Sequence, residues 1–480
     1  MPHFTCNMGE TAQPFPHFWE HTVGSGYAPL ALRADWQAQL KQCHHELGFR
    51  HVRFHGILHD DMGTLITHAD ELLYSFFNAD QIVDFLLSIG MRPFLELSFM
   101  PWTLASGDKT VFSYRGNVTP PKDYEAWATL IRKLVEHWVE RYGLEEVRHW
   151  YFEVWNEPNL HHFWTGAQAD YFNLYRHTVN AIKGIDESLV VGGPATAQNE
   201  WIAEFLEFCQ QNQLPADFVS THYYPTDAFG KIGSDTETQL ANAPPGVMRD
   251  RAQEAHRHAG GRPLFYTEWN VSSNPRHDLH DMSFAAAFAT RILMNLDDLV
   301  QGYSFWTFSD IFTENYFPSI PFHGGFGLLN LHGIAKPVYR AFELLHRLGD
   351  ERLEVTGSHE TVASWVVRRE HSATILIINH AQPRHEIQTE QVGIHLLHAP
   401  EPEEVTVERI DEDHANPRRL WVEMGEPKYP TPSQVQQLQD ASRLVAEPHP
   451  WQYEQQTLQL DCQITPQGVA AITVRFRPQP

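Results

Sequence analysis

Short apolar runs alternate with amphipathic segments from about residue 20 to residue 347. The clearest amphipathic segment is 124–142, where apolar residues from Trp127 to Tyr142 recur every three or four positions and form one helical face. The apolar runs are predicted to be strands: 21–25, 50–55, 92–98, 149–155, 189–192, 217–222, 263–268 and 302–307. The predicted helices are 35–47, 80–89, 124–142, 169–185, 200–212, 245–259, 284–296 and 337–347.

This alternation amounts to eight strand–helix units. Repeated units of this kind predict a parallel sheet covered by helices, and eight of them close a barrel. The predicted fold class is therefore α/β, a (β/α)8 TIM barrel with a smaller C-terminal domain.

The pattern changes after Gly349. Short β-runs follow, and a polar, proline-rich stretch from 400 to 450 contains one helical pattern near 433–442. The expected β-runs are 362–368, 373–379, 404–410, 456–460 and 471–476. We expect three parts: an N-terminal arm (1–14), a catalytic barrel (15–347) and a β-sandwich-like accessory domain (348–480). The accessory domain offers surface for assembly, so the chain could form a homo-oligomer.

Charge restricts the classes of partner. The chain has 60 acidic and 35 basic residues among 480, a formal charge of −25. Nucleic acids, anionic membrane surfaces and sulfated polysaccharides favour a basic face instead. We therefore expect no nucleic-acid and no membrane partner.

Cysteine and histidine usage predicts neither a disulfide framework nor a metal site. The four cysteines have no short spacing, and no HExxH motif occurs among the 30 histidines. The N-terminal segment MPHFTCNMGETAQPF has neither a basic nor an apolar signal region. The expectation is a cytoplasmic protein with reduced thiols, no metal and no cofactor.

Two predicted strands end in a glutamate. WYFEVWNEPN (150–159) carries Glu157, and PLFYTEWN (263–270) carries Glu268. The C-terminal strand ends of a barrel hold its chemistry, and two carboxyl groups at that mouth suit glycosidic cleavage, one as acid and one as nucleophile. The alternative is two structural glutamates paired with arginines such as Arg53.

These motifs resemble the clan of retaining glycosidases with (β/α)8 barrels, and within it glycoside hydrolase family 39, which contains β-xylosidases and α-L-iduronidases. The resemblance extends over nearly the whole chain and is closest to the β-xylosidase branch. Its segments are VRFHG (52–56), WNEPN (155–159), THYYP (221–225), YTEWN (266–270), FWTFSDIF (305–312) and PTPSQVQQLQDAS (430–442).

The resemblance implies a role for each matched position. Glu157 would be the acid/base and Glu268 the nucleophile of a retaining double displacement, with carboxyl groups about 5–5.5 Å apart. The implied substrate-binding residues are Asn156 at the sugar 2-hydroxyl, His55 and His222 at glycone hydroxyls, Tyr224 near the nucleophile, Trp306 as an apolar floor and Glu314 at further glycone hydroxyls. His55, His222 and Tyr224 could each be structural instead, Trp306 could belong to the core, and Glu314 could be a solvated loop residue.

One position departs from the family pattern. In the β-xylosidase branch FWTFSD is followed closely by Glu-Glu, whereas this chain has Thr313-Glu314. The expected partner is a small oligosaccharide with terminal β-linked xylose, since the matching motifs hold no Lys or Arg suited to an iduronate carboxylate. The alternatives are an α-L-arabinopyranosidase, β-galactosidase, β-glucosidase or iduronidase-like specificity, a non-catalytic sugar-binding protein, or a scaffold protein.

Overall fold

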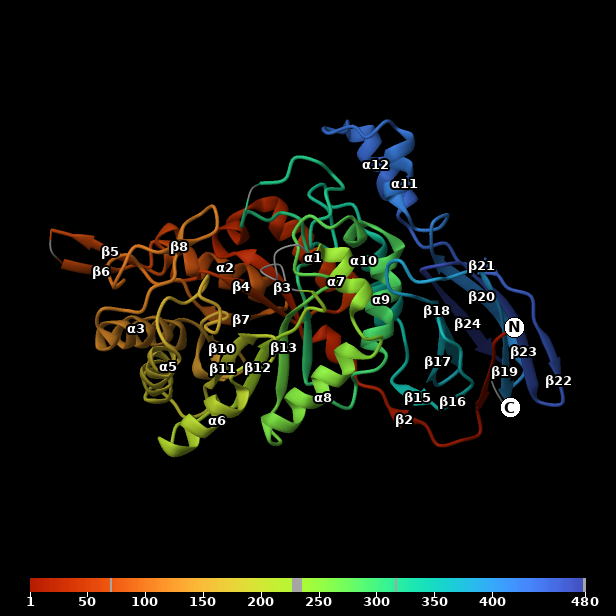
Figure 1. Cartoon of the computed structure of the whole chain (residues 1–480), viewed down its shortest axis with the longest axis horizontal. Coiled ribbons are helices and arrows are strands. Elements are labelled where there is room, and N and C mark those ends of the chain that lie inside the picture. Colours follow the sequence, from red (N-terminus) through yellow and green to blue (C-terminus); the bar gives the residue numbers. More distant parts are fainter. Residues whose placement is uncertain (70, 227–234, 316, 478–480) are drawn as a thin grey trace.

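A closed parallel barrel forms the larger part of the computed structural model, which describes residues 1–69, 71–226, 235–315 and 317–477 (Figure 1). Each of its eight strands overlaps an expected apolar run, and β14 pairs with β3 to close the ring. The strands are β3 (Thr22–Tyr27), β4 (His51–His55), β7 (Arg92–Leu97), β10 (Tyr151–Val154), β11 (Val190–Ala197), β12 (Phe218–His222), β13 (Leu264–Trp269) and β14 (Gly302–Phe305). The predicted (β/α)8 barrel is confirmed.

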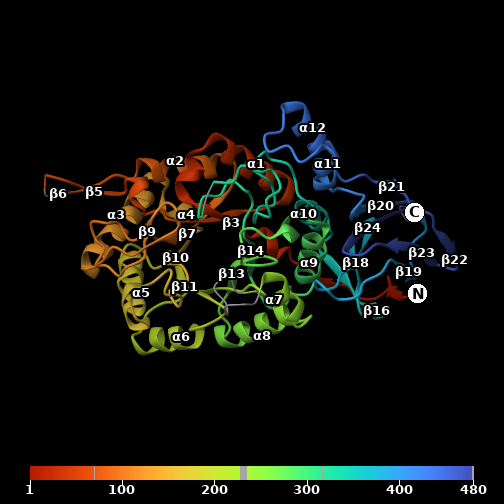
Figure 2. The ribbon, with the colours of Figure 1, turned by 45° about the horizontal axis from the view of Figure 1, so that its top comes forward.

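Helices surround the barrel (Figure 2). In α3 the Asp123 side chain accepts hydrogen bonds from the first backbone N–H groups, and the helix buries the predicted face from Trp127 to Trp138. The eight predicted helices are α1 (Ala34–Leu47), α2 (Phe77–Ser88), α3 (Tyr124–Tyr142), α5 (Gln168–Lys183), α6 (Ile202–Gln211), α8 (Val247–Ala259), α9 (Ser283–Leu293) and α10 (Pro337–His346). Shorter elements are η1 (Phe18–Glu20), η2 (Ala28–Leu32), η3 (Asp60–Met62), β5 (Leu65–His68), β6 (Glu71–Tyr74), β8 (Thr110–Val111), β9 (Gly116–Asn117), α4 (Leu144–Val147), α7 (Thr236–Asn242) and η4 (Asp278–Asp281).

The side chains inside the barrel are apolar near the N-terminal ends of the strands and charged further along them. Phe94, Phe218 and Phe265 pack together as an aromatic layer near the N-terminal ends of their strands. Above this layer Arg53, at the centre of β4, is fully buried together with acidic side chains from neighbouring strands. The apolar floor therefore supports a charged layer that leads to the C-terminal strand ends.

Two sheets make up the C-terminal part. One has the order β16-β1-β19-β23-β22 and the other β2-β15-β17-β18-β24-β20-β21. Residues 1–14, expected as an arm, supply β1 (His3–Asn7) and β2 (Gln13–Pro14), and β1 runs parallel to β19. The remaining strands are β15 (Glu351–Leu353), β16 (Val355–Thr356), β17 (Val362–Arg369), β18 (Ser372–Asn379), β19 (Glu390–Leu397), β20 (Pro402–Ile410), β21 (Glu447–Pro448), β22 (Gln452–Glu454), β23 (Thr457–Ile464) and β24 (Gly468–Phe476).

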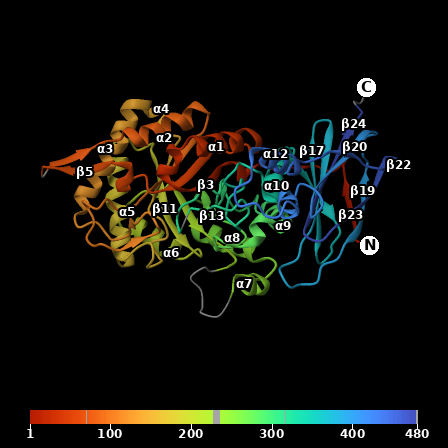
Figure 3. The same cartoon turned by 90° about the horizontal axis from the view of Figure 1, so that it is seen from above.

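The larger sheet is apolar on both faces. On β17, Trp365 and Val367 belong to the same hydrophobic cluster as the barrel, whereas Val366 belongs to the cluster between the two sheets. Leu376 and Ile377 of β18 divide in the same way. Because successive strand residues point to opposite faces, one face of this sheet packs on the barrel and the other packs on the second sheet. The barrel and the sandwich therefore lie against each other (Figure 3).

A helical pair extends from the sandwich. α11 (Pro417–Glu423) and α12 (Pro432–Ala441) place Trp421 and Leu438 against Phe322 and Ile334 of the barrel loops. Across the described ranges, no helix is both long and apolar enough to cross a membrane.

Candidate active site

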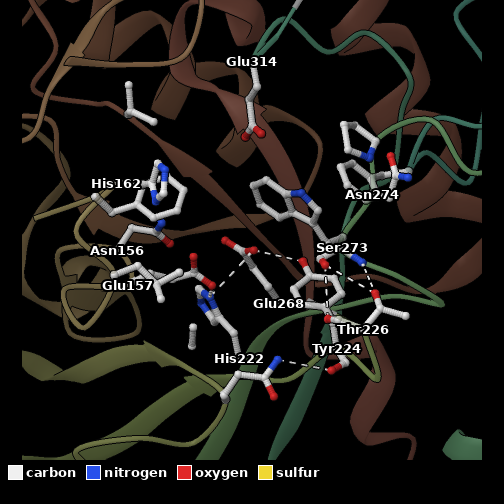
Figure 4. A pocket seen from close by; sticks show the side chains of 18 of the residues that line it. Asn156, Glu157, His162, His222, Tyr224, Thr226, Glu268, Ser273, Asn274 and Glu314 are labelled. Atoms are coloured by element: carbon white, nitrogen blue, oxygen red, sulfur yellow. Dashed lines mark hydrogen bonds and ion pairs between the residues drawn. The ribbon is translucent and has the colours of Figure 1, made fainter. Parts of the chain in front are cut away.

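A cavity of about 800 Å³ opens at the C-terminal ends of the barrel strands. Figure 4 shows side chains from several strands converging on it. All eight residues singled out from the sequence line this cavity: His55, Asn156, Glu157, His222, Tyr224, Glu268, Trp306 and Glu314. The fold thus brings residues from position 55 to position 314 into one site.

Glu157 and Glu268 face each other across this cavity. Glu268 lies on β13, whereas Glu157 follows β10 in a turn with φ of 43°, where its N–H donates to the Ala195 carbonyl at 2.8 Å. One carboxylate oxygen of Glu157 lies within 4.8 Å of one carboxylate oxygen of Glu268. Retaining glycosidases hold their two carboxyl groups roughly 5–5.5 Å apart, and inverting enzymes hold them roughly 6.5–9.5 Å apart.

The two carboxyl groups have different surroundings. Burial raises the pKa of Glu157 well above its ordinary value, and the nearby charge of Glu268 raises it further. Glu268 is contacted by a permanent cation, with Arg53 Nη1 at 2.8 Å from Oε1, and by the Tyr224 hydroxyl, which donates to Oε2 at 3.0 Å. These contacts favour a protonated Glu157 beside an ionised Glu268.

Arg53, expected from the sequence only as a structural partner of the glutamates, contacts several side chains of the site. Its guanidinium also donates to Glu153, and to Asn156 Oδ1 at 2.9 Å, and it lies 3.2 Å from Glu96. Three of these side chains, Arg53, Glu96 and Glu153, have no solvent exposure. The sequence signal for this network is that each of these three charged residues lies inside an otherwise apolar strand, where a charge needs a buried partner.

His55 is held as a cation. Burial alone would lower its pKa, but Glu96, which accepts from Nδ1, and Glu314 outweigh burial and raise the pKa to about 10. Its Nε2 lies 3.5 Å from Glu314 and 3.7 Å from Glu268. Burial raises the pKa of Glu314 to about 7, so this carboxyl group is predicted to titrate near neutrality.

His222 is held in the neutral form instead. Burial lowers its pKa well below the ordinary value, and the charges of Arg53 and His55 act in the same direction. Its Nδ1 lies 2.9 Å from Glu157 Oε1, and its Nε2 lies 3.1 Å from the Thr267 hydroxyl. His222 is therefore placed to share a proton with Glu157.

Aromatic side chains form one wall. Trp306, Tyr224 and Phe326 pack together, and Trp306 is only 3% exposed. Gly24 of β3 permits this packing, because a Cβ there would lie 2.6 Å from the Trp306 ring. An apolar ring surface beside convergent hydroxyl-binding groups is typical of a carbohydrate site.

Thr313, the departure from the family pattern, is not among the lining residues of the cavity, although Glu314 and Asn315 are. Its carbonyl accepts from the Ser113 hydroxyl. Glu314, the retained carboxylate of the pair, is the one that reaches the cavity.

Among the residues that the structure describes, two groups of side chains have the ligand atoms of a metal site. One is Glu157, His222 and Glu268 in the cavity, and the other is His17, Glu20 and His346, which do not line it. In the first group Arg53 and Tyr224 already bind the Glu268 oxygens, and a guanidinium beside the site repels a metal cation.

The comparisons with known proteins agree with this architecture. The family model of glycosyl hydrolases family 39 matches residues 5–457. The chain belongs to glycosyl hydrolases family 39. As a member of that family it is a glycoside hydrolase.

Three relatives match over most of their length. A protein of Caldicellulosiruptor saccharolyticus named beta-xylosidase is 48% identical over 477 residues, which cover 98% of each chain. A Geobacillus stearothermophilus beta-xylosidase is 40% identical and covers 89% of this chain and 87% of its own. The crystal structure of a monomeric beta-xylosidase from Caulobacter crescentus is 33% identical, with a TM-score of 0.88 over 100% of both chains.

Proposed function

We propose that this family 39 enzyme is an exo-acting β-xylosidase that releases xylose from the ends of short xylo-oligosaccharides with retention of configuration. The observation that carries this proposal is the pair Glu157 and Glu268, whose oxygens approach within 4.8 Å while their surroundings favour opposite protonation states. The names of the two curated relatives support xylose as the glycone.

In the first step Glu268 attacks the anomeric carbon as Glu157 protonates the leaving oxygen. The C–O bond to the aglycone breaks, and an ester bond between Glu268 and the sugar forms. Arg53 and Tyr224 hold both Glu268 oxygens in place, which orients the carboxylate for attack.

In the second step the ionised Glu157 accepts a proton from water, whose oxygen bonds to the anomeric carbon. The bond between that carbon and Glu268 breaks, and the Glu268 carboxylate is released with the free sugar. The pKa of Glu157 falls once the charge of Glu268 is consumed in the ester, because that charge is one cause of the raised pKa. The same residue thus serves as acid and then as base.

Buried side chains at one end of the cavity support exo-action on a neutral terminal sugar. His55, Trp306 and Glu314 are all less than 8% exposed and bound the cavity on the Glu268 side. His55 and Glu314 offer a cationic donor and a carboxyl group to sugar hydroxyls. The expected sugar presents adjacent hydroxyls there and no carboxylate.

Hydrolysis of para-nitrophenyl β-D-xylopyranoside by wild type and by Glu268→Ala, with azide added to the variant, tests the proposal. We expect activity in wild type, loss in the variant, and partial rescue as a glycosyl azide of inverted configuration. Tyr124→Phe on the outer helix α3 is the matched control and should retain activity.

Two outcomes would contradict parts of the proposal separately. A wild type silent on the xyloside but active on the arabinoside, glucoside, galactoside or iduronide would overturn the glycone. Release of inverted xylose by wild type, followed by nuclear magnetic resonance, would overturn the double displacement.

A further inference from the structure

Three side chains with metal-ligand atoms meet outside the active site, where the segment before β3 contacts the end of α10. Glu20 Oε1 lies 2.8 Å from Nδ1 of His17 and 2.8 Å from Nδ1 of His346, which is 326 positions further along the chain. All three ligand atoms lie within 4.8 Å of one another. Family 39 hydrolysis, as proposed above, has no use for this cluster.

The outer nitrogen of His17 fixes the orientation of its ring. His17 Nε2 lies 3.0 Å from the Gly349 carbonyl oxygen, which only accepts, so Nε2 carries the hydrogen. The ring is also stacked on Trp19, with centroids 4.7 Å apart. Metal-ligating histidines are typically held in this way, by a hydrogen bond from the second nitrogen to a carbonyl or carboxylate.

The inner atoms of the cluster converge on one carboxylate oxygen. The Nδ1 atoms of His17 and His346 each lie 2.8 Å from Glu20 Oε1. Among the described residues, the ion pairs of Glu20 are those with His17 and His346, so no arginine or lysine occupies the space between these three ligand atoms.

We propose that His17, Glu20 and His346 bind a divalent transition metal of the zinc class. Two imidazole nitrogens and one carboxylate oxygen are ligands that zinc accepts, with water in the remaining position. Ligand atoms of a tetrahedral zinc site lie about 3.3 Å apart, so binding requires Glu20 Oε1 to withdraw by about 0.5 Å from each nitrogen. Side-chain exposures of 17%, 13% and 35% leave the ion a path from solvent.

The site would act as a clamp on the fold. It joins η1, which precedes the first barrel strand, to α10, the last barrel helix, and through His17 to Gly349 at the start of the sandwich. Because the ligands come together only in the folded chain, bound metal stabilises the folded state by mass action.

Titration of the metal-stripped full-length protein with ZnCl2 by calorimetry tests the site, with thermal unfolding followed in parallel. We expect one saturable equivalent and a higher unfolding temperature. Affinity should fall at least tenfold in His17→Gln and in Glu20→Gln. His222→Gln removes a ligand from the active-site cluster and should leave the stoichiometry unchanged.

The opposite pattern would overturn the proposal: no saturable binding, or binding that survives His17→Gln and disappears in His222→Gln. Chemical modification keeps the test decisive if the substituted chains misfold. In wild type, zinc should protect His17 and His346 from diethyl pyrocarbonate, and equal modification with and without zinc would leave a proton-bridged cluster as the explanation.

Discussion

At the scale of single residues, Arg53 on β4 joins the buried carboxylates of three other strands into one charge network. It contacts Glu96, Glu153 and Glu268 directly, and the first two have no solvent exposure. Burial raises the pKa of Glu153, and the Arg53 guanidinium opposes this. The cation at the barrel centre therefore compensates the buried carboxylates and holds Glu268 Oε1 in place.

Arg53→Met is expected to lower the free energy of unfolding by about 3–5 kcal/mol, because it leaves buried carboxylates without their partner. Activity should fall as well, since Glu268 loses the contact that holds Oε1. Urea unfolding measures the first effect. Arg33→Met, which removes an exposed pair with Asp35, is the control and should cost at most about 1 kcal/mol. Equal losses in the two variants would contradict the network.

Glu157 is expected to set the alkaline limb of the pH profile of kcat/KM. Its pKa is raised by burial and by Glu268, so the proton needed at the leaving oxygen is retained to a higher pH than in an ordinary glutamate and is lost as pH rises through that pKa. In Glu157→Gln this limb should disappear with a dinitrophenyl xyloside, whose leaving group needs no acid. Persistence of the limb would assign it to another group, such as Glu314.

At the scale of elements, a buried ion cluster holds the loop that carries Phe326. Lys336 at the start of α10 lies 2.7 Å from Asp281 and 2.7 Å from Asp310, and all three are almost fully buried. Lys336 Nζ donates to the Gly325 carbonyl, and the N–H of Gly327 donates to Asp310. The cluster thus fixes both neighbours of Phe326, which packs on Trp306 in the sugar site.

Lys336→Met is expected to loosen this loop and, on the proposed function, to raise KM for the xyloside more than it lowers kcat. The reason is that Phe326 belongs to the aromatic wall of the cavity and not to the pair of carboxyl groups. Stability should also fall by about 3–5 kcal/mol, since two buried aspartates lose their cation. Steady-state kinetics below the unfolding range separate the two effects. A loss confined to kcat, with KM unchanged, would speak against a positioning role.

How much the sequence predicts depends on how local the signal is. The eight barrel strands and their helices follow from periodicity within each segment, and Glu157 and Glu268 follow from motifs at strand ends. The charged layer around Arg53 follows only in part. A charged residue inside an apolar strand indicates that a buried partner is needed, but the partners lie on other strands and the local sequence does not say which residues they are. β1 was missed for the same reason, since HFTCN gains its partner β19 only in the folded chain.

At the scale of the whole molecule, barrel and sandwich share a wall. Trp365 and Leu376 face the barrel core, while their neighbours Val366 and Ile377 face the core between the sheets. Contacts between α9 and both β18 and β24 reinforce this junction. If this sheet unfolds, both hydrophobic cores lose one of their sides.

This shared wall predicts that the molecule unfolds as one cooperative unit. Phe4 on β1 is 3% exposed and lies in the core between the sheets, away from the barrel, so Phe4→Ala should cost about 3–5 kcal/mol there. If the unit is single, calorimetry shows one transition whose van't Hoff and calorimetric enthalpies agree. In that case Phe4→Ala lowers the temperature at which hydrolytic activity is lost together with the temperature of unfolding. Glu10→Ala, at an exposed position, should change neither temperature by more than the equivalent of about 0.5 kcal/mol. Two transitions, with inactivation unmoved by Phe4→Ala, would instead mean that the barrel keeps its site without the sandwich, and that the charged layer above its aromatic floor is stabilised by the barrel alone.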